Sequence, residues 1–229
     1  YIVIWLVLCY ILLTAFLLSK NKRPRLLTLG VVTGLAAAIS LSWLEPKLDN
    51  YRVTVLDVGQ GQSVLLQWED KNFLVDCGGD SGQMAADTVI HRLLSQGLTR
   101  LDGVILTHYD KDHVNGVENL LSWIDTETLY LPDTEPADPN RLSLEKTFAD
   151  RICWINEDTV LSADNGKITL FTGGNTENRN ENCTSVLFQT DYCDILITGD
   201  LGVSGEQTLL EKTDLPTLDL LVAGHHGSA

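Results

Sequence analysis

Thr107-His108-Tyr109-Asp110-Lys111-Asp112-His113 holds the densest group of metal-binding side chains in this 229-residue chain. The stretch directly follows an apolar run over residues 101–106, which predicts a buried strand. A turn after that strand can direct the first His and the first Asp to one side and the second Asp and the second His to the other. This arrangement suits two cations a few ångströms apart better than one. An acidic helix cap would explain one His here, but two His and two Asp at this density predict a metal site.

The rest of the soluble part reads as alternating strands and helices. Strands are predicted over residues 51–58, 63–68, 71–75, 101–106, 151–155, 167–171, 184–189, 193–198 and 218–223. Helices are predicted over residues 85–96, 114–123, 141–150 and 203–212. This alternation predicts a mixed sheet covered by helices. Residues 131–140, which contain three prolines, are interpreted as a surface connector, with a substrate-gating flap as the alternative.

Potential ligands recur just past the ends of the predicted strands. They are Asp57, Asp76, His108, Asp200 and His225. Asp beside glycine is also ordinary turn chemistry, so both explanations stay open for Asp57 and Asp76. A rigid sheet presents its chemistry at strand ends, and an Asp there can orient a metal-ligating His. Given the cluster at residues 108–113, Asp200 and the pair His225-His226 become predicted ligands.

The cysteines form no metal-binding pattern. Cys9, Cys77, Cys153, Cys183 and Cys193 include no Cys-x-x-Cys pair. An oxidising compartment would permit a disulfide among the last four, but buried free thiols are the expectation for most of them.

Two uncharged apolar runs, residues 1–19 and 26–44, precede the soluble part. Each is long enough to cross a bilayer core as a helix at about 1.5 Å per residue. The first run lacks the basic leading segment and the cleavage site of a signal peptide. Four basic residues fall within residues 20–25, and short basic loops stay cytoplasmic. Residues after Leu44 are therefore expected on the extracytoplasmic face, and the chain is interpreted as a fragment of a larger membrane protein.

Charge separates along the chain. All 31 acidic residues but only 12 of the 16 basic residues lie after Leu44, which leaves a formal charge of −19 on residues 45–229. Such a surface excludes broad basic contact with nucleic acid. A polyanionic substrate would have to be held by metals and a few local cations.

Five motifs in order carry a family resemblance: Asp57-Val58-Gly59-Gln60-Gly61-Gln62-Ser63, Asp76-Cys77-Gly78-Gly79, residues 107–116, Thr198-Gly199-Asp200 and His225-His226-Gly227-Ser228. They resemble the metallo-β-lactamase superfamily, and within it the ComEC family of competence channels for transforming DNA. The resemblance implies an αβ/βα sandwich over residues 45–229, preceded by two transmembrane helices over residues 1–44. Further strands and a helix are expected after residue 229. It also implies a bacterial inner-membrane protein whose extracytoplasmic domain degrades the strand that is not imported.

The resemblance implies roles residue by residue. His108 and Asp110 resemble ligands of a first metal, and Asp112 and His113 ligands of a second, with Asp200 bridging both. One of His225 and His226 completes the second site and the other donates a proton to the leaving group. Catalytic roles thus fall on Asp112, Asp200 and His226. Contacts to phosphate or to a metal-bound water are expected from Lys111, Asn182 and Ser185, although the last two could equally flank a hairpin.

The chain departs from the superfamily pattern at the first metal. Asp110 replaces a His, and no His occurs between His113 and His225, where another ligand is normal. A site richer in oxygen favours Mn²⁺ or Mg²⁺ over Zn²⁺. Two such cations would lower the pKa of a bridging water and neutralise the oxygens of an in-line phosphoryl displacement.

The expected partners are DNA, the membrane and other DNA-uptake proteins, without a nucleotide cofactor. Two other functions remain open. One is hydrolysis of a small extracytoplasmic phosphodiester or ester at the same site. The other is a non-catalytic domain that caps the channel, which would not need clustered ionisable ligands.

Overall fold

The computed structural model describes residues 7, 9–11, 13–14, 17, 29–40, 51–163, 165–174 and 178–227. The chain divides into two compact units, Tyr1–Asn50 and Tyr51–Ala229. Residues 29–40 of the first unit are helical. Within the described residues, no helix combines the length and the apolar character that a membrane crossing needs. Much of the two expected spans, residues 1–19 and 26–44, lies outside the described residues.

The second unit begins with a six-stranded sheet in the order β1-β2-β3-β4-β5-β6. Its strands are β1 (Tyr51–Val55), β2 (Val64–Trp68), β3 (Lys71–Val75), β4 (Arg100–Ile105), β5 (Asp125–Pro132) and β6 (Ile152–Ile155). The first three strands pair antiparallel, and β3 to β6 run parallel. The carboxyl ends of β3 and β4 are therefore neighbours, with Val75 beside Ile105.

A second sheet of five strands has the order β11-β10-β9-β8-β7. Its strands are β7 (Thr159–Ala163), β8 (Gly166–Phe171), β9 (Ser185–Thr190), β10 (Asp194–Ile197) and β11 (Leu220–Val222). All pairs are antiparallel except β10 with β11. The parallel pair brings the segment after β11 to the same edge of the sheet as the segment after β10.

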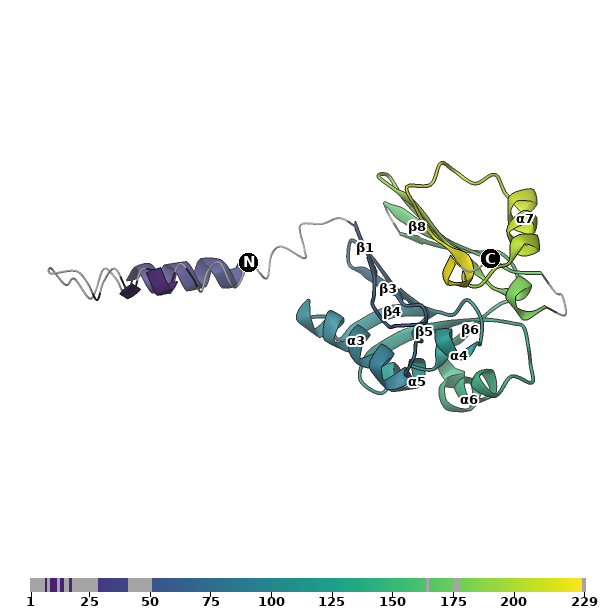
Figure 1. The fold of residues 1–229 in the computed structure, drawn as a ribbon, viewed down its shortest axis with the longest axis horizontal. Coiled ribbons are helices and arrows are strands. Elements are labelled where there is room, and N and C mark those ends of the chain that lie inside the picture. The colour runs from purple at the N-terminus through teal and green to yellow at the C-terminus, as the bar shows by residue number, and fades with distance from the viewer. Residues whose placement is uncertain are drawn as a thin grey trace. The chain divides into compact units, whose positions relative to one another are not determined.

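Helices cover the outer face of each sheet. Helices α3 (Gly82–Ser95), α5 (Val117–Leu121) and α6 (Pro139–Phe148) lie together beside the first sheet, and α7 (Val203–Lys212) lies beside the second (Figure 1). The local sequence explains α6 well. Pro139 occupies its first turn, and the Asp138 carboxylate caps it by accepting from the backbone N–H of Asn140 and Arg141.

Three buried apolar clusters fill the layers between these elements. Strand alternation separates the first two, because Leu74 belongs to the cluster under α3 and α5, while Phe73 and Val75 join Val186 and Phe188 of the second sheet. A third cluster, which includes Leu187 and Leu209, lies under α7. The order helix, sheet, sheet, helix confirms the expected αβ/βα sandwich.

Several expected elements differ from the observed ones. The helix expected over residues 114–123 is two short helices, α4 (Lys111–Val114) and α5, because the chain turns at Asn115 and Gly116. The expected connector over residues 131–140 instead begins inside β5 and ends inside α6. Strands β5 and β7 were not expected at all, since Asp-Thr-Glu-Thr at the start of β5 and Thr and Ser in β7 conceal their apolar positions.

All five cysteines are free thiols, and Cys77 and Cys183 are buried. Burial raises the pKa of Cys77 to about 12 and that of Cys183 further. Neither thiol is therefore ionised at neutral pH. Cys153 is exposed and Cys193 is partly buried, so the expectation of buried thiols holds for two of the four in the second unit.

Candidate metal centre

The His108–His113 segment crosses from the end of β4 into α4. The backbone N–H of Leu106 donates to the carbonyl of Tyr130 in β5 at 2.9 Å, so the sheet continues one residue beyond β4. Asp110 is the N-cap residue of α4, and His113 lies within the helix, fully buried. His108 and His113 thus approach each other from a loop and a helix, with ring centroids 4.1 Å apart.

Two glycine-containing turns, one after β1 and one after β3, pack against the backbone of this segment. The backbone N–H of Gln62 donates to the carbonyl of Asp112 at 3.1 Å, and that of Cys77 donates to the carbonyl of His113 at 2.9 Å. A side chain at Gly78 would put its Cβ 2.4 Å from the backbone of Asp112 and His113. The glycines after β1 and β3 therefore let two turns pack against the backbone of α4.

Asp76 lies at the end of β3, fully buried, and binds both the loop and the helix. Its Oδ1 accepts from the backbone N–H of Thr107 at 2.8 Å, and its Oδ2 accepts from Thr107 Oγ1 at 2.7 Å and from Gln62 Nε2 at 2.8 Å. The same Oδ2 forms an ion pair with His113 Nδ1 at 2.8 Å. Because Nδ1 faces a carboxylate, the other ring nitrogen is turned towards the centre of the site.

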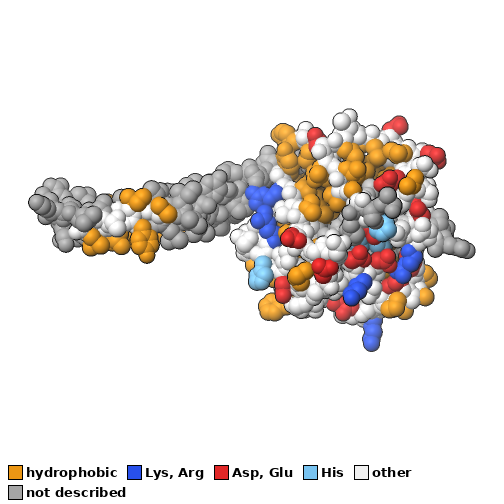
Figure 2. All heavy atoms as spheres, in the orientation of Figure 1, with side chains coloured by type: hydrophobic (Ala, Val, Ile, Leu, Met, Phe, Trp, Pro, Cys, Tyr) orange, Lys and Arg blue, Asp and Glu red, His pale blue; other side chains and the backbone are white. Residues whose placement is uncertain are grey.

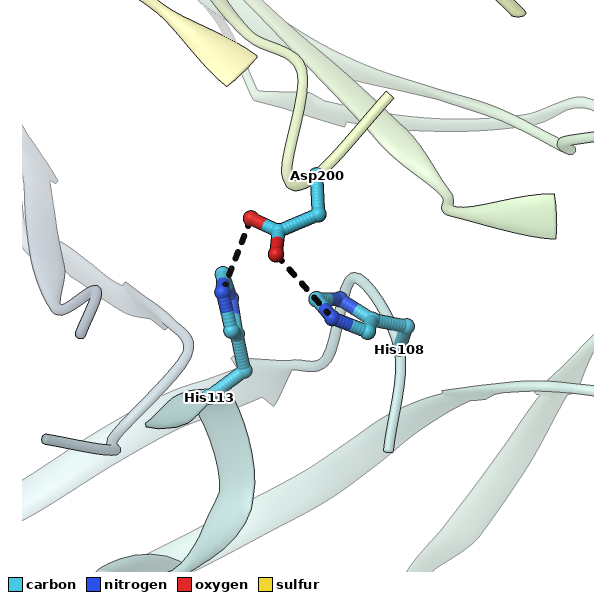
Figure 3. A group of neighbouring side chains, drawn as sticks. All are labelled: His108, His113 and Asp200. Carbon is cyan, nitrogen blue, oxygen red and sulfur yellow. Dashed lines mark ion pairs between the residues drawn. The ribbon is translucent and has the colours of Figure 1, made fainter. Parts of the chain in front are cut away.

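Asp200 reaches the two histidines from the second sheet (Figure 3). Its Oδ1 lies 3.0 Å from His113 Nε2, and its Oδ2 lies 3.7 Å from His108 Nε2. One ligand atom from each of the three buried residues falls within 4.8 Å of the others. Two ligand atoms bound to one ion at about 2.1 Å lie roughly 3 to 3.5 Å apart in tetrahedral geometry, so this spacing fits a metal ion.

Gly199 allows this approach of the two sheets. Its φ is +60°, and a Cβ there would lie 2.8 Å from Cβ of Thr107. The backbone N–H of Thr184 also donates to the carbonyl of Thr107 at 2.8 Å. The metal-binding loop is therefore contacted at two points beside the second sheet, by the residue before β9 and by the turn after β10.

The electrostatics of the site favour a cation. Burial lowers the pKa of His113, but the carboxylates of Asp76 and Asp200 outweigh it and raise that pKa to about 10. Burial lowers the pKa of His108, and the charge of His113 adds to the effect. His108 Nε2 is buried and makes no hydrogen bond to any described residue. Two imidazoles and a carboxylate are donors that Zn²⁺ and Mn²⁺ accept, so the residues fit a divalent metal.

Asp110 lies at the edge of this group. Its Oδ2 is 3.7 Å from His108 Nε2, and its Oδ1 forms an ion pair with Arg179 Nη2 at 3.1 Å. It is one third exposed and is not among the three residues whose ligand atoms gather within 4.8 Å. Asp112 is half-buried on α4, and it too lies outside that group.

The other predicted site residues are spread more widely. Asp57 and Lys111 are exposed. His225 is exposed on the turn η3 (Gly224–Gly227), where its backbone N–H donates to the carbonyl of Gly199 at 3.2 Å, and its φ is +50°. The side chain of His226 lies outside the described part of the molecule. The turn therefore lies next to the Gly199-Asp200 segment.

Asn182 and Ser185 lie on the second sheet and its preceding turn, η2 (Arg179–Asn182). Asn182 is buried at the end of η2. Ser185 shares a face of β9 with Leu187, which packs under α7, and it lines a small cavity there together with Glu181 and Lys212. The Ser185 side chain therefore points towards α7, away from the face of β9 that packs on the first sheet.

The last residue of β5 and the first turn of α6 support the metal-binding loop, a role that the sequence analysis missed. The Tyr109 hydroxyl donates to the carbonyl of Pro132 at 2.7 Å, and Asn140 Nδ2 donates to the carbonyl of Tyr109 at 2.9 Å. Arg179 was also missed. It is the only basic residue in the polar stretch 173–182, and a single cation there could have indicated a contact with acidic side chains.

Acidic side chains gather near a histidine on one face of the second unit, with a few basic side chains beside them (Figure 2). This distribution agrees with the formal charge of −19 on residues 45–229. It makes the face attractive to cations and repulsive to anions unless metals are bound.

Sequence comparisons support the resemblance. The profile of the metallo-beta-lactamase superfamily matches residues 56–229. The ComE operon protein 3 of Bacillus subtilis is 25% identical over 95% of this chain and 30% of its own length. Recombination protein 2 of Haemophilus influenzae is 27% identical over 92% of this chain and 26% of its own. The competence protein ComA of Neisseria gonorrhoeae is 29% identical over 77% of this chain and 24% of its own. The chain thus spans less than a third of the curated relatives it matches.

Solved structures agree on the fold. The metallo-β-lactamase SMB-1, bound to mercaptoacetic acid, superposes with a TM-score of 0.53 over 77% of both chains, at 14% identity. A metallo-β-lactamase of Cronobacter sakazakii superposes with a TM-score of 0.54 over 76% of both chains, at 12% identity. These similarities extend the match to the three-dimensional arrangement of the layers.

Proposed function

Since this chain belongs to the metallo-β-lactamase superfamily, we propose that it is a metal-dependent hydrolase that cleaves phosphodiester bonds of DNA during DNA uptake. The superfamily suggests metal-dependent hydrolysis, and the competence-related relatives support a role in uptake. The observation that carries the proposal is the buried group His108, His113 and Asp200. On this view the strand that is not imported is the substrate.

The residues of the chain divide the work. His108, His113 and Asp200 are proposed to hold metal, with Asp110 beside His108 on the first ion, and Asp112 and His225 are proposed to extend the set to a second ion. Asp76 fixes the ring of His113 through Nδ1. His226 is proposed to give a proton to the leaving oxygen. Divalent ions, when bound, activate water and offset the charge of the phosphate.

The proposal is tested by hydrolysis assays on the metal-free full chain after addition of Mn²⁺, Mg²⁺ or Zn²⁺. Single-stranded DNA and bis(p-nitrophenyl) phosphate are the two substrates. We expect cleavage of DNA, strongest with Mn²⁺. Turnover of the small diester alone would support a small-ester hydrolase. Metal binding without turnover of either substrate would support a non-catalytic domain.

Exchange of Asp110 for His tests the metal preference. Asp110→His adds an imidazole beside His108 and removes an oxygen donor. We expect Zn²⁺ affinity to rise and Mn²⁺-supported cleavage of DNA to fall, because imidazole suits Zn²⁺ and carboxylate suits Mn²⁺. The measurement is cleavage at matched metal occupancy. Unchanged Mn²⁺ activity would show that Asp110 does not bind the metal.

We also propose that residues 20–25 are cytoplasmic and that the chain from Leu48 onward is extracytoplasmic. The basic loop between two uncharged runs supports this orientation. A reporter that works only outside the cytoplasm is expected to be active when it is fused after Asn50. Activity of a reporter that works only in the cytoplasm would overturn the proposed orientation.

A further inference from the structure

Arg179 links the metal-binding loop to the segment between β5 and α6. It lies at the start of η2, just before the second sheet, and its side chain is 45% exposed. A single nitrogen, Nη2, contacts the carboxylates of Asp110 at 3.1 Å, Glu135 at 2.5 Å and Asp138 at 2.8 Å. Three segments that are distant in sequence therefore meet at one guanidinium.

One of the three carboxylates, that of Asp138, is anchored independently of Arg179. Asp138 is nearly buried, and its Oδ1 caps α6 while its Oδ2 faces Arg179. Glu135 has a φ of +52°, in a region that residues other than glycine rarely adopt, and its side chain is 16% exposed. Such a conformation persists only where the surroundings impose it. Asp138 and Glu135 together hold Arg179 in place, and Arg179 can then hold Asp110.

The third carboxylate, Asp110, is the one that faces the metal centre. With Oδ1 bound to Arg179, its Oδ2 points to within 3.7 Å of His108 Nε2. That distance is too long for a hydrogen bond and is close to the separation of two ligands on one ion. The arrangement leaves one oxygen of Asp110 available towards His108.

The local charge argues against a direct role in phosphate binding. Three carboxylates surround one guanidinium, so the cluster is negative as a whole and would repel an anion. Supporting residues that orient metal ligands typically change metal affinity by about 10- to 100-fold when they are replaced. The contacts of Arg179 are those of such a residue.

We propose that Arg179 is a positioning residue that prepares Asp110 to bind a divalent metal beside His108. The inference rests on the proposed metal site, and it adds a residue outside the sequence motifs to that site. On this proposal, η2 and the segment between β5 and α6 together fix the orientation of the Asp110 carboxylate.

The test is a calorimetric titration of the metal-free full chain with Mn²⁺ and, separately, with Zn²⁺. No nucleic acid is present in this titration. We expect Arg179→Met to weaken binding about 10- to 100-fold. Arg179→Lys should recover most of the affinity, because an ammonium group can also contact all three carboxylates. Arg100→Met is the matched control, since Arg100 pairs with exposed Glu127 and lies at the start of β4, at the opposite end of the strand from the site.

A double-mutant cycle separates positioning from simple charge. If Arg179 acts through Asp110, then Arg179→Met should change affinity less than about twofold once Asp110→Ala is present. A persistent effect in that background would overturn the inference. So would a gain of affinity in Arg179→Met alone, which indicates that Arg179 only repels the cation. Unchanged metal affinity in Arg179→Met, together with weaker binding of single-stranded DNA in a separate assay, would also overturn it and indicate a phosphate contact.

Failure of the inference and failure of the proposed function give different results. If the wild-type chain binds no divalent metal, the proposed metal site itself is wrong. If the wild-type chain binds metal and Arg179→Met binds it equally well, only the role of Arg179 is wrong. Thermal unfolding of each variant without metal shows whether a loss of affinity reflects a loss of fold.

Discussion

Asp200→Ala is expected to weaken the binding of every divalent metal by at least about 100-fold. Loss of a residue that only orients a ligand costs up to about 100-fold in metal affinity, and loss of a ligand itself should cost at least as much. The reason is the central place of this carboxylate. One oxygen lies 3.0 Å from His113 Nε2 and the other lies 3.7 Å from His108 Nε2. Among the described residues, Asp200 is the carboxylate that forms ion pairs with Nε2 of both histidines. Hydrolysis should be abolished with Mn²⁺, Mg²⁺ and Zn²⁺ alike.

Calorimetric titration with Mn²⁺ and Zn²⁺ measures this loss directly. Asp194→Ala is the control, because Asp194 begins the same strand, β10, and contacts Gln189 at the opposite end from the site. The control should bind metal like the unchanged chain. Retention of metal affinity within about tenfold in Asp200→Ala would mean that Asp200 does not hold the ion.

Asp76→Ala is expected to produce the largest loss of folding stability, about 3–5 kcal/mol, the usual cost of removing one partner from a buried ion pair. The substitution leaves His113 Nδ1, Thr107 and Gln62 without their common acceptor in a fully buried place. It also puts alanine at a φ of +58°. Denaturant unfolding of the metal-free chain measures the change in the free energy of unfolding.

Two variants make this result specific. Asp76→Asn keeps the shape and tolerates the left-handed backbone, so it should lose less stability while still misdirecting His113. Asp102→Ala removes a partly exposed carboxylate that pairs with Lys71 and accepts from the backbone N–H of Asn72, and it should cost no more than about 2 kcal/mol. Equal losses in Asp76→Ala and Asp102→Ala would contradict the assigned role of Asp76.

The sequence predicted the fold well wherever the apolar pattern was simple. Strand β3 and helix α7 have the expected bounds, because one is a short apolar run and the other has regular spacing. Strand β5 escaped prediction because its burial comes from its central position between β4 and β6, which no local pattern reveals. The division of residues 111–121 into two helices depends on a close approach of Gly116 to Cys77, which is also a tertiary effect.

For the site, the sequence predicted residue types and strand ends but could not predict distances. The structure brings together His108, His113 and Asp200, with Asp76 beside His113. It leaves Asp57 and Lys111 exposed and turns Ser185 towards α7. The alternation of side chains along β9 explains the orientation of Ser185, because neighbouring residues of a strand point to opposite faces of the sheet. The support from Tyr109, Asn140 and Arg179 depends on loop geometry that sequence patterns do not encode.

The meeting of two sheets at Thr107 also has a consequence for the order of folding. His108 and His113 follow a strand of the first sheet, whereas Asp200 follows β10 of the second, far along the chain. Contacts between residues so distant in sequence form late, because long loops must close first. A chain that has formed only its first sheet therefore presents the two imidazoles with Asp76 but without Asp200. High-affinity capture of a metal ion during refolding would then report the moment at which the two sheets dock.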